Sequence, residues 1–141
     1  MYFVPILETW VFPFNKVEYQ TLMARIAIIE DDENVGNTIV KVLERAGYQM
    51  VLFVDAAKAI SDCDWSQIDL VLTDLVMSTS GEELIEFVQQ EKPQIPIVVN
   101  TGVVGDRLER VREFDVVRVL KKPFHPRDLL STVREILTQE D

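Results

Sequence analysis

The sequence contains a single cysteine, Cys63, and a single histidine, His125, among its 141 residues. One cysteine cannot form a disulfide within the chain, which favours a reducing compartment, so we expect a cytoplasmic protein. Neither residue belongs to a Cys/His cluster with the spacing of a zinc site. We therefore interpret Cys63 as a small structural residue. His125 directly precedes Pro126, and we interpret it as a residue at the entry of a helix.

Basic side chains are also scarce, because 14 Lys and Arg stand against 24 Asp and Glu, for a net charge of −10. Binding to phosphate backbones or anionic lipids depends on clusters of Lys and Arg, so we expect no nucleic-acid partner and no membrane partner. No apolar run reaches the roughly 18 residues that a membrane-spanning helix needs. A composition of 48% hydrophobic residues still allows a buried core, and the length is that of one domain.

The first 22 residues, MYFVPILETWVFPFNKVEYQTL, are rich in apolar and aromatic side chains. They lack the basic region and the small-residue cleavage site of a secretory signal, and Pro5, Glu8 and Pro13 interrupt them. Two interpretations stay open. Residues 1–22 are an N-terminal extension that packs on the domain, or they lie upstream of a true start at Met23. In both cases we expect the domain itself at residues 23–141.

From Met23 onward, short apolar runs alternate with stretches of helical periodicity. The runs predict strands at about 25–29, 49–54, 68–73, 97–101 and 116–121. The helical stretches are placed by a stop at Gly47, a cap at Asp55, a start after Gly81, the segment DRLERVREF, and an opening at Pro126. Strands that alternate with helices predict an α/β fold, in which helices cover both faces of a five-stranded parallel sheet.

Polar side chains follow the predicted strands where each strand ends. The first strand is followed by Glu30, Asp31 and Asp32, the third by Asp74, the fourth ends in Thr101, and the fifth runs into Lys122. A strand order of 2-1-3-4-5 would gather them around one crevice at the carboxyl edge of the sheet. Carboxylates about 4 Å apart repel by roughly 4 kcal/mol near a protein surface, so a converging cluster needs a cation. Carboxylates, a hydroxyl and an ammonium together are the groups of a phosphoryl-transfer site that uses Mg²⁺.

Four stretches, IIEDDE, LVLTDLVM, IPIVVNTG and VLKKPFHPRDLL, resemble the receiver domain of two-component response regulators. The resemblance covers Met23 to about Thr138 and implies a flavodoxin-like, doubly wound (βα)5 fold with strand order 2-1-3-4-5. It also implies phosphorelay signal transduction by a stand-alone, single-domain regulator of the chemotaxis type. A sensor histidine kinase would be one partner. A downstream effector would bind the face formed by the fourth helix, fifth strand and fifth helix, and the protein would be a monomer or weak dimer.

The resemblance also implies roles for individual residues. Asp74 would be the phosphoacceptor that becomes 4-aspartylphosphate, Thr101 the switch hydroxyl, and Lys122 the lysine of the site. Mg²⁺ would be held by Asp31, Asp74 and the backbone carbonyl of Val76, with Glu30 acting through water. Asp32 would be a solvated neighbour of the acidic pair.

Three features depart from the usual pattern of this family. Met77 is followed by Ser78 instead of proline, and Gly81 comes seven residues after Asp74, which makes this loop one residue shorter. Val119 stands three residues before Lys122, where the family usually has an aromatic side chain. The stretch between Thr101 and Lys122 is also compact, which predicts a short or mobile fourth helix. None of these features replaces a phosphorylation residue.

Two other functions use similar groups. A receiver-like module that acts only through protein contacts and is never phosphorylated would not need the complete set of site residues. A Mg-dependent phosphatase of the haloacid-dehalogenase type places its nucleophile in an Asp-x-Asp motif on the first strand, where this chain has Glu30-Asp31-Asp32. We therefore expect a signalling phosphoacceptor and not an enzyme, one that catalyses only its own phosphorylation and dephosphorylation.

Overall fold

The computed structural model describes residues 24–77, 81–102, 105–116 and 118–138. Residues 1–22, for which two interpretations stand open, and Ser78 lie outside this part of the chain. The elements in chain order are β1 (Arg25–Ile29), α2 (Glu33–Arg45), β2 (Gln49–Phe53), α3 (Ala56–Asp62), the short 3-10 helix η2 (Trp65–Gln67), β3 (Leu70–Thr73), α4 (Gly81–Glu91), β4 (Ile97–Thr101), α5 (Asp106–Arg112), β5 (Arg118–Lys121) and α6 (Pro126–Thr138).

The five strands form one parallel sheet in the order β2-β1-β3-β4-β5, which confirms the predicted topology. Register pairs align the carboxyl ends of the central strands. Ile29 lies opposite both Phe53 and Thr73, and Thr73 lies opposite Val99. The residues that follow these strands therefore emerge side by side at one edge of the sheet.

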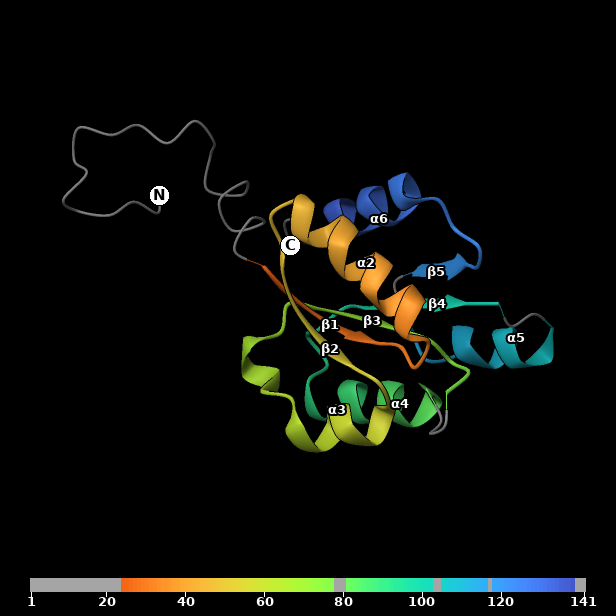
Figure 1. Cartoon of the computed structure of the whole chain (residues 1–141). Helices are drawn as coiled ribbons and strands as arrows, with labels where there is room; N and C mark the ends of the chain where they lie inside the picture. The colour runs from red at the N-terminus through yellow and green to blue at the C-terminus, as the bar shows by residue number, and fades with distance from the viewer. Residues whose placement is uncertain (1–23, 78–80, 103–104, 117, 139–141) are drawn as a thin grey trace.

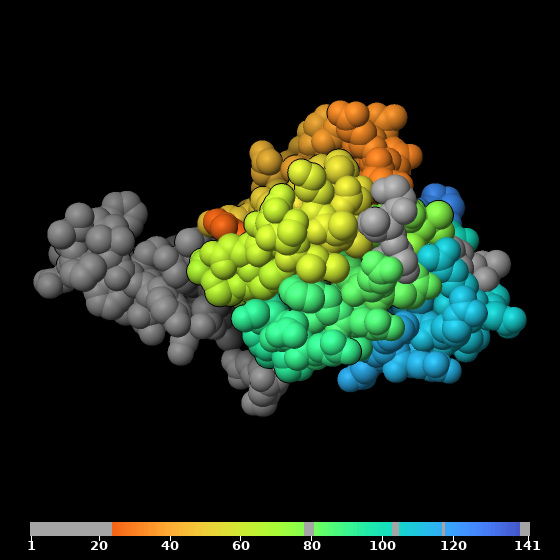
Figure 2. Space-filling model, turned by 90° about the horizontal axis from the view of Figure 1, so that it is seen from below, coloured from red at the N-terminus to blue at the C-terminus, as the bar shows by residue number. Residues whose placement is uncertain are grey.

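Helices cover both faces of the sheet, with α2 and α6 on one face and α3 and α4 on the other (Figure 1). Successive strand residues point to opposite faces. Ile28, Leu72 and Val98 accordingly pack with residues of α2 and α6, in one of two core clusters. Their neighbours Ile29, Val71 and Val99 pack in the other cluster, with residues of α3, α4 and α5. Figure 2 shows the face that α3 and α4 cover.

Short polar side chains and a glycine set the helix ends. Asp55 caps α3 as predicted, and its Oδ1 accepts a hydrogen bond from Lys58 N at 2.7 Å. Gly47 follows α2 with a φ of 97°, a left-handed conformation that glycine adopts without steric cost. Asp32, expected as a solvated neighbour, is exposed but also caps α2, because its Oδ1 accepts from Asn34 N and Val35 N. His125 Nδ1 accepts from Arg127 N at the entry of α6, which confirms it as a helix-entry residue.

Some predicted boundaries differ from the structure by one or two residues. β2 ends at Phe53 and not at residue 54, and β5 begins at Arg118 and not at residue 116. β3 begins at Leu70 and not at residue 68, because Trp65–Gln67 form a 3-10 helix that ends at Ile68. α4 begins at Gly81 itself, one residue earlier than expected.

Cys63 is half-buried, and burial raises the pKa of its thiol to about 11, so the thiol stays protonated and unreactive at neutral pH. Within the described ranges, no helix combines the length and the apolar character needed to cross a membrane.

The start of α4 packs directly on the backbone that follows β3. A Cβ at Gly81 would lie 2.2 Å from the carbonyl oxygen of Asp74 and 2.8 Å from the Cα of Leu75. A Cβ at Gly36, on α2, would meet only the flexible end of Leu52, at 3.3 Å. Of these two helical glycines, Gly81 is therefore the one whose position leaves no room for a side chain.

We predict that Gly81→Ala lowers the free energy of unfolding by about 3 kcal/mol, because backbone must move to admit the methyl group. Gly36→Ala should be neutral or stabilising by up to about 1 kcal/mol, since alanine is the better helix former. Urea unfolding of both variants measures the difference. Equal midpoints for the two variants would contradict the close packing at Gly81.

Candidate functional site

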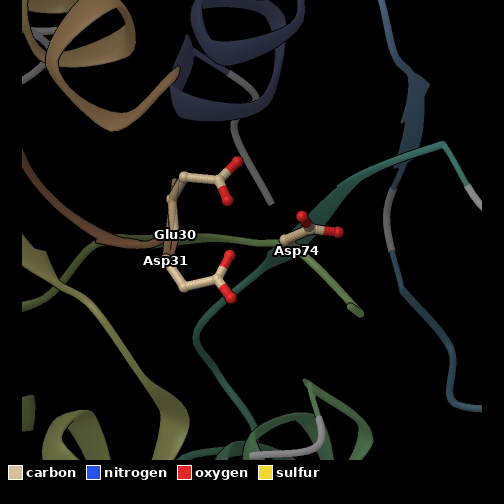
Figure 3. Close-up of side chains that lie close together, drawn as sticks. All are labelled: Glu30, Asp31 and Asp74. Carbon is tan, nitrogen blue, oxygen red and sulfur yellow. The ribbon is translucent and has the colours of Figure 1, made fainter. Parts of the chain in front are cut away.

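Three carboxylates converge at the carboxyl edge of the sheet (Figure 3). Glu30 and Asp31 follow β1, and Asp74 follows the neighbouring strand β3. One oxygen from each of the three lies within 4.8 Å of the others. Glu30 is 1% exposed and Asp74 is 5% exposed, whereas Asp31 is exposed. The acidic run of the sequence is therefore a cluster with two buried members and one that faces solvent.

Lys122 is the cation that stabilises this cluster. Its Nζ donates hydrogen bonds to Glu30 Oε1 and to Asp74 Oδ2, the latter at 2.8 Å. The backbone N–H of Lys122 donates to the carbonyl oxygen of Thr101 at 2.9 Å, which places the end of β5 beside β4. Because Lys122 comes from the edge strand β5, its ammonium links the ends of β5, β3 and β1.

The backbone orients the carboxylate of Asp74. Asp74 Oδ1 accepts hydrogen bonds from Leu75 N at 2.6 Å and from Val76 N at 3.2 Å. Asp74 Oδ2 is the oxygen bound to Lys122. Each oxygen of this carboxylate thus has its own donors, so the side chain is held in one orientation.

Arg107 on α5 lies near this site, although no sequence motif predicts its contact there. Its Nη2 donates to the carbonyl oxygen of Leu75 at 2.9 Å, and its guanidinium forms a two-point ion pair with Glu82 on α4. Leu75 therefore gives its N–H to Asp74 and its carbonyl oxygen to Arg107. No sequence spacing links Arg107 to Leu75 or Glu82, because they are 32 and 25 residues apart.

Burial and charge act in opposite directions on the acidic cluster. Burial raises the pKa of Glu30, and the bond from Lys122 offsets only part of this effect. Burial also lowers the pKa of Lys122, but the bonds and charges of Asp74 and Glu30 outweigh it and leave the pKa raised. Lys122 is therefore charged at neutral pH. With all three carboxylates ionised, one ammonium leaves two negative charges uncompensated, which suits a divalent cation held by oxygen ligands.

The structure thus brings together Glu30, Asp31, Asp74 and Lys122, four of the residues predicted from the sequence. Thr101 is fully buried at the end of β4, in register with Lys121. Val76 follows Asp74 by two residues, and its side chain is 53% exposed. The ligand role of its backbone carbonyl stays a prediction.

Comparisons with known proteins show which family this chain is similar to. The family model described as “Response regulator receiver domain” matches residues 26–134. The response regulator receiver protein CpdR of Brucella abortus (strain 2308) is 35% identical over 119 residues, which cover 82% of this chain and 98% of CpdR. The transcriptional regulatory protein CpxR of Escherichia coli (strain K12) is 30% identical over 118 residues, which cover 82% of this chain but 50% of CpxR. The solved non-phosphorylated HemR receiver domain from Leptospira biflexa has a TM-score of 0.76 and 26% identity, and the match covers 84% of this chain and 97% of that domain.

We predict that Mg²⁺ raises the melting temperature of the wild-type protein, because a cation that binds only the folded state stabilises it by about 2.7 kcal/mol at 100 times its dissociation constant. Asp31→Asn should weaken this effect, since it removes one ligand charge. Asp32→Asn is the matched control, because the neighbouring Asp32 lies outside the cluster and asparagine keeps its capping role. Equal Mg²⁺ responses of the two variants, or none in the wild type, would count against a metal site.

Proposed function

The chain belongs to the response regulator receiver domain family, and we propose that Asp74 is the residue on which it accepts a phosphoryl group. Receiver domains take part in phosphorelay signal transduction, in which histidine kinases phosphorylate them and they act on effector proteins. The observation that carries the assignment is the set of donors around Asp74, where two backbone N–H groups bind one oxygen and Lys122 binds the other. The other two carboxylates differ from Asp74 in exposure, since Glu30 is more deeply buried than Asp74 and Asp31 is exposed to solvent.

In the proposed transfer, a carboxylate oxygen of Asp74 attacks the phosphorus of a phosphohistidine on the kinase. The new O–P bond forms as the P–N bond breaks, and the imidazole nitrogen keeps the electron pair. Lys122, already bonded to Asp74, is placed to bind a phosphoryl oxygen, and the hydroxyl of Thr101 is proposed to bind another. Mg²⁺ held by Asp31, Asp74 and the Val76 carbonyl, with Glu30 acting through water, would neutralise charge on the carboxylates and the phosphoryl oxygens.

We also propose that the protein works as a stand-alone regulator, a monomer or weak dimer that catalyses only its own phosphorylation and dephosphorylation. The match to nearly the whole of CpdR supports this reading. In the labels of Figure 1, the proposed effector face is formed by α5, β5 and α6. Arg107 supports this choice, because it joins α5 to the loop that carries Asp74.

We predict that acetyl phosphate with Mg²⁺ adds the mass of one phosphoryl group to the wild-type protein and nothing to Asp74→Asn. Intact mass spectrometry measures both. Asp55→Asn is the control, because it makes the same chemical change at a helix cap away from the acidic cluster. Equal labelling of Asp74→Asn and wild type would overturn the assignment, and no labelling of the wild type would favour a module that acts only through protein contacts.

We propose that the receiver domain begins at Met23 and that residues 1–22 are an extension outside it. The family match begins at residue 26, and the first site residue is Glu30. A protein that starts at Met23 should therefore fold and be labelled at the wild-type rate. Circular dichroism and the acetyl phosphate assay check the two expectations. Loss of folding would show instead that the aromatic segment belongs to the core.

A further inference from the structure

Asn100 on β4 is a polar side chain buried without a hydrogen bond. It is 0% exposed, and neither its Oδ1 nor its Nδ2 has a partner. Among the described residues, the only other buried side-chain nitrogen or oxygen in this condition is Nε1 of Trp65. An unpaired buried amide costs about 1 to 3 kcal/mol, so its presence next to Thr101 needs a reason.

The register of the sheet places Asn100 beside the phosphoacceptor. Val99 lies opposite Thr73, so the next residues on these two strands, Asn100 and Asp74, are level with each other. On its other side Asn100 pairs with Leu120 of β5. Val98 and Leu120 both face the core cluster under α2 and α6, and strand alternation puts Asn100 on that same face.

The side chain of Lys122 has to extend across β4 to reach the carboxylates. β4 lies between β5 and β3, and adjacent strands are about 4.8 Å apart, so β5 and β3 are separated by nearly 10 Å. Lys122 nevertheless bonds to Asp74 after β3 and to Glu30 after β1. It lines a cavity with Ile39 and Leu129 of α2 and α6, which places it on the face that Asn100 shares. The amide of Asn100 therefore lies along the path of the lysine side chain.

We propose that Asn100 is a positioning residue for Lys122, with its amide oxygen as the acceptor to which the ammonium turns when the carboxylates bind other partners. This role rests on the proposed function. When Glu30 and Asp74 turn their oxygens to a divalent cation or a phosphoryl group, they give up bonds to Lys122. A partly buried ammonium that loses acceptors is costly. Asn100 offers a neutral acceptor with no competing bond, so it holds the ammonium near Asp74 without adding negative charge.

The main test is Asn100→Leu, which keeps the approximate shape and removes both polar atoms. Without Mg²⁺ its melting temperature should equal or exceed that of the wild type, because no buried polar group is left unpaired. Its Mg²⁺ dissociation constant, from melting temperatures across a titration, should rise about 5-fold, the effect of one lost hydrogen bond. Labelling by acetyl phosphate should slow by a similar factor. Thr132→Val, a buried change on α6 between Leu129 and Val133, is the control and should leave the dissociation constant unchanged.

A double-mutant cycle with Lys122→Met separates this role from a general packing effect. If Asn100 acts through the ammonium, Asn100→Leu should not weaken Mg²⁺ binding further in the Lys122→Met background. The pair Asn100→Thr and Asn100→Val gives a second measurement, because they differ only by a hydroxyl and a methyl group. The threonine variant should bind Mg²⁺ more tightly than the valine variant.

Two results would overturn the role of Asn100 while the proposed function stands. One is a wild-type dissociation constant for Asn100→Leu, and the other is the same 5-fold loss with and without Lys122. A wild-type protein that neither responds to Mg²⁺ nor is labelled on Asp74 would overturn the proposed function, and the role of Asn100 with it.

Discussion

The ammonium of Lys122 is the interaction on which both the site and this edge of the fold depend. It bonds to Glu30 and Asp74, residues that are 92 and 48 positions away in the chain. The two carboxylates and Asp31 lie close enough to repel one another by several kcal/mol. Because Lys122 reaches them from the edge strand, it opposes this repulsion and also ties β5 to the centre of the sheet. The same contact therefore stabilises the sheet and holds the charged groups of the site together.

The ammonium of Lys122 does not balance the negative charge of the site. One ammonium against three carboxylates cannot neutralise the cluster, and burial of Glu30 increases the cost of its charge. A second lysine or arginine in contact would stabilise the fold more, but it would compete with a divalent cation for the same oxygens. Asn100 also lowers the stability of the fold, because its unpaired amide is buried where an apolar side chain would be more favourable. Rules of stable packing are often broken at functional sites, and both departures lie within one strand of Asp74.

The sheet could be predicted from sequence because its central strands β3 and β4 are buried on both faces and appear as the apolar runs LVL and IPIVV. Topology then placed Glu30, Asp31, Asp74 and Lys122 together, since the carboxyl ends of parallel strands meet at one edge. Contacts between side chains of different elements could not be predicted in this way. The binding of Arg107 to Leu75, and the burial of the Asn100 amide without a hydrogen bond, depend on distances that no local pattern encodes. The capping role of Asp32 follows a local rule, since aspartate is a favoured residue directly before a helix, but the same residue also belongs to an acidic run that predicts a charge cluster.

Arg107 gives a physical link between the loop that carries Asp74 and the face proposed for the effector. The backbone N–H of Leu75 donates to Asp74, and its carbonyl oxygen, which lies in the next peptide unit, accepts from Arg107. A change in how Asp74 is held can therefore move the guanidinium or weaken its bond to Leu75. The ion pair with Glu82 restrains the first response, because it fixes Arg107 against α4. With Val119 in place of an aromatic side chain on β5, this chain of bonds is a connection between the site and α5 that does not require an aromatic ring to change position.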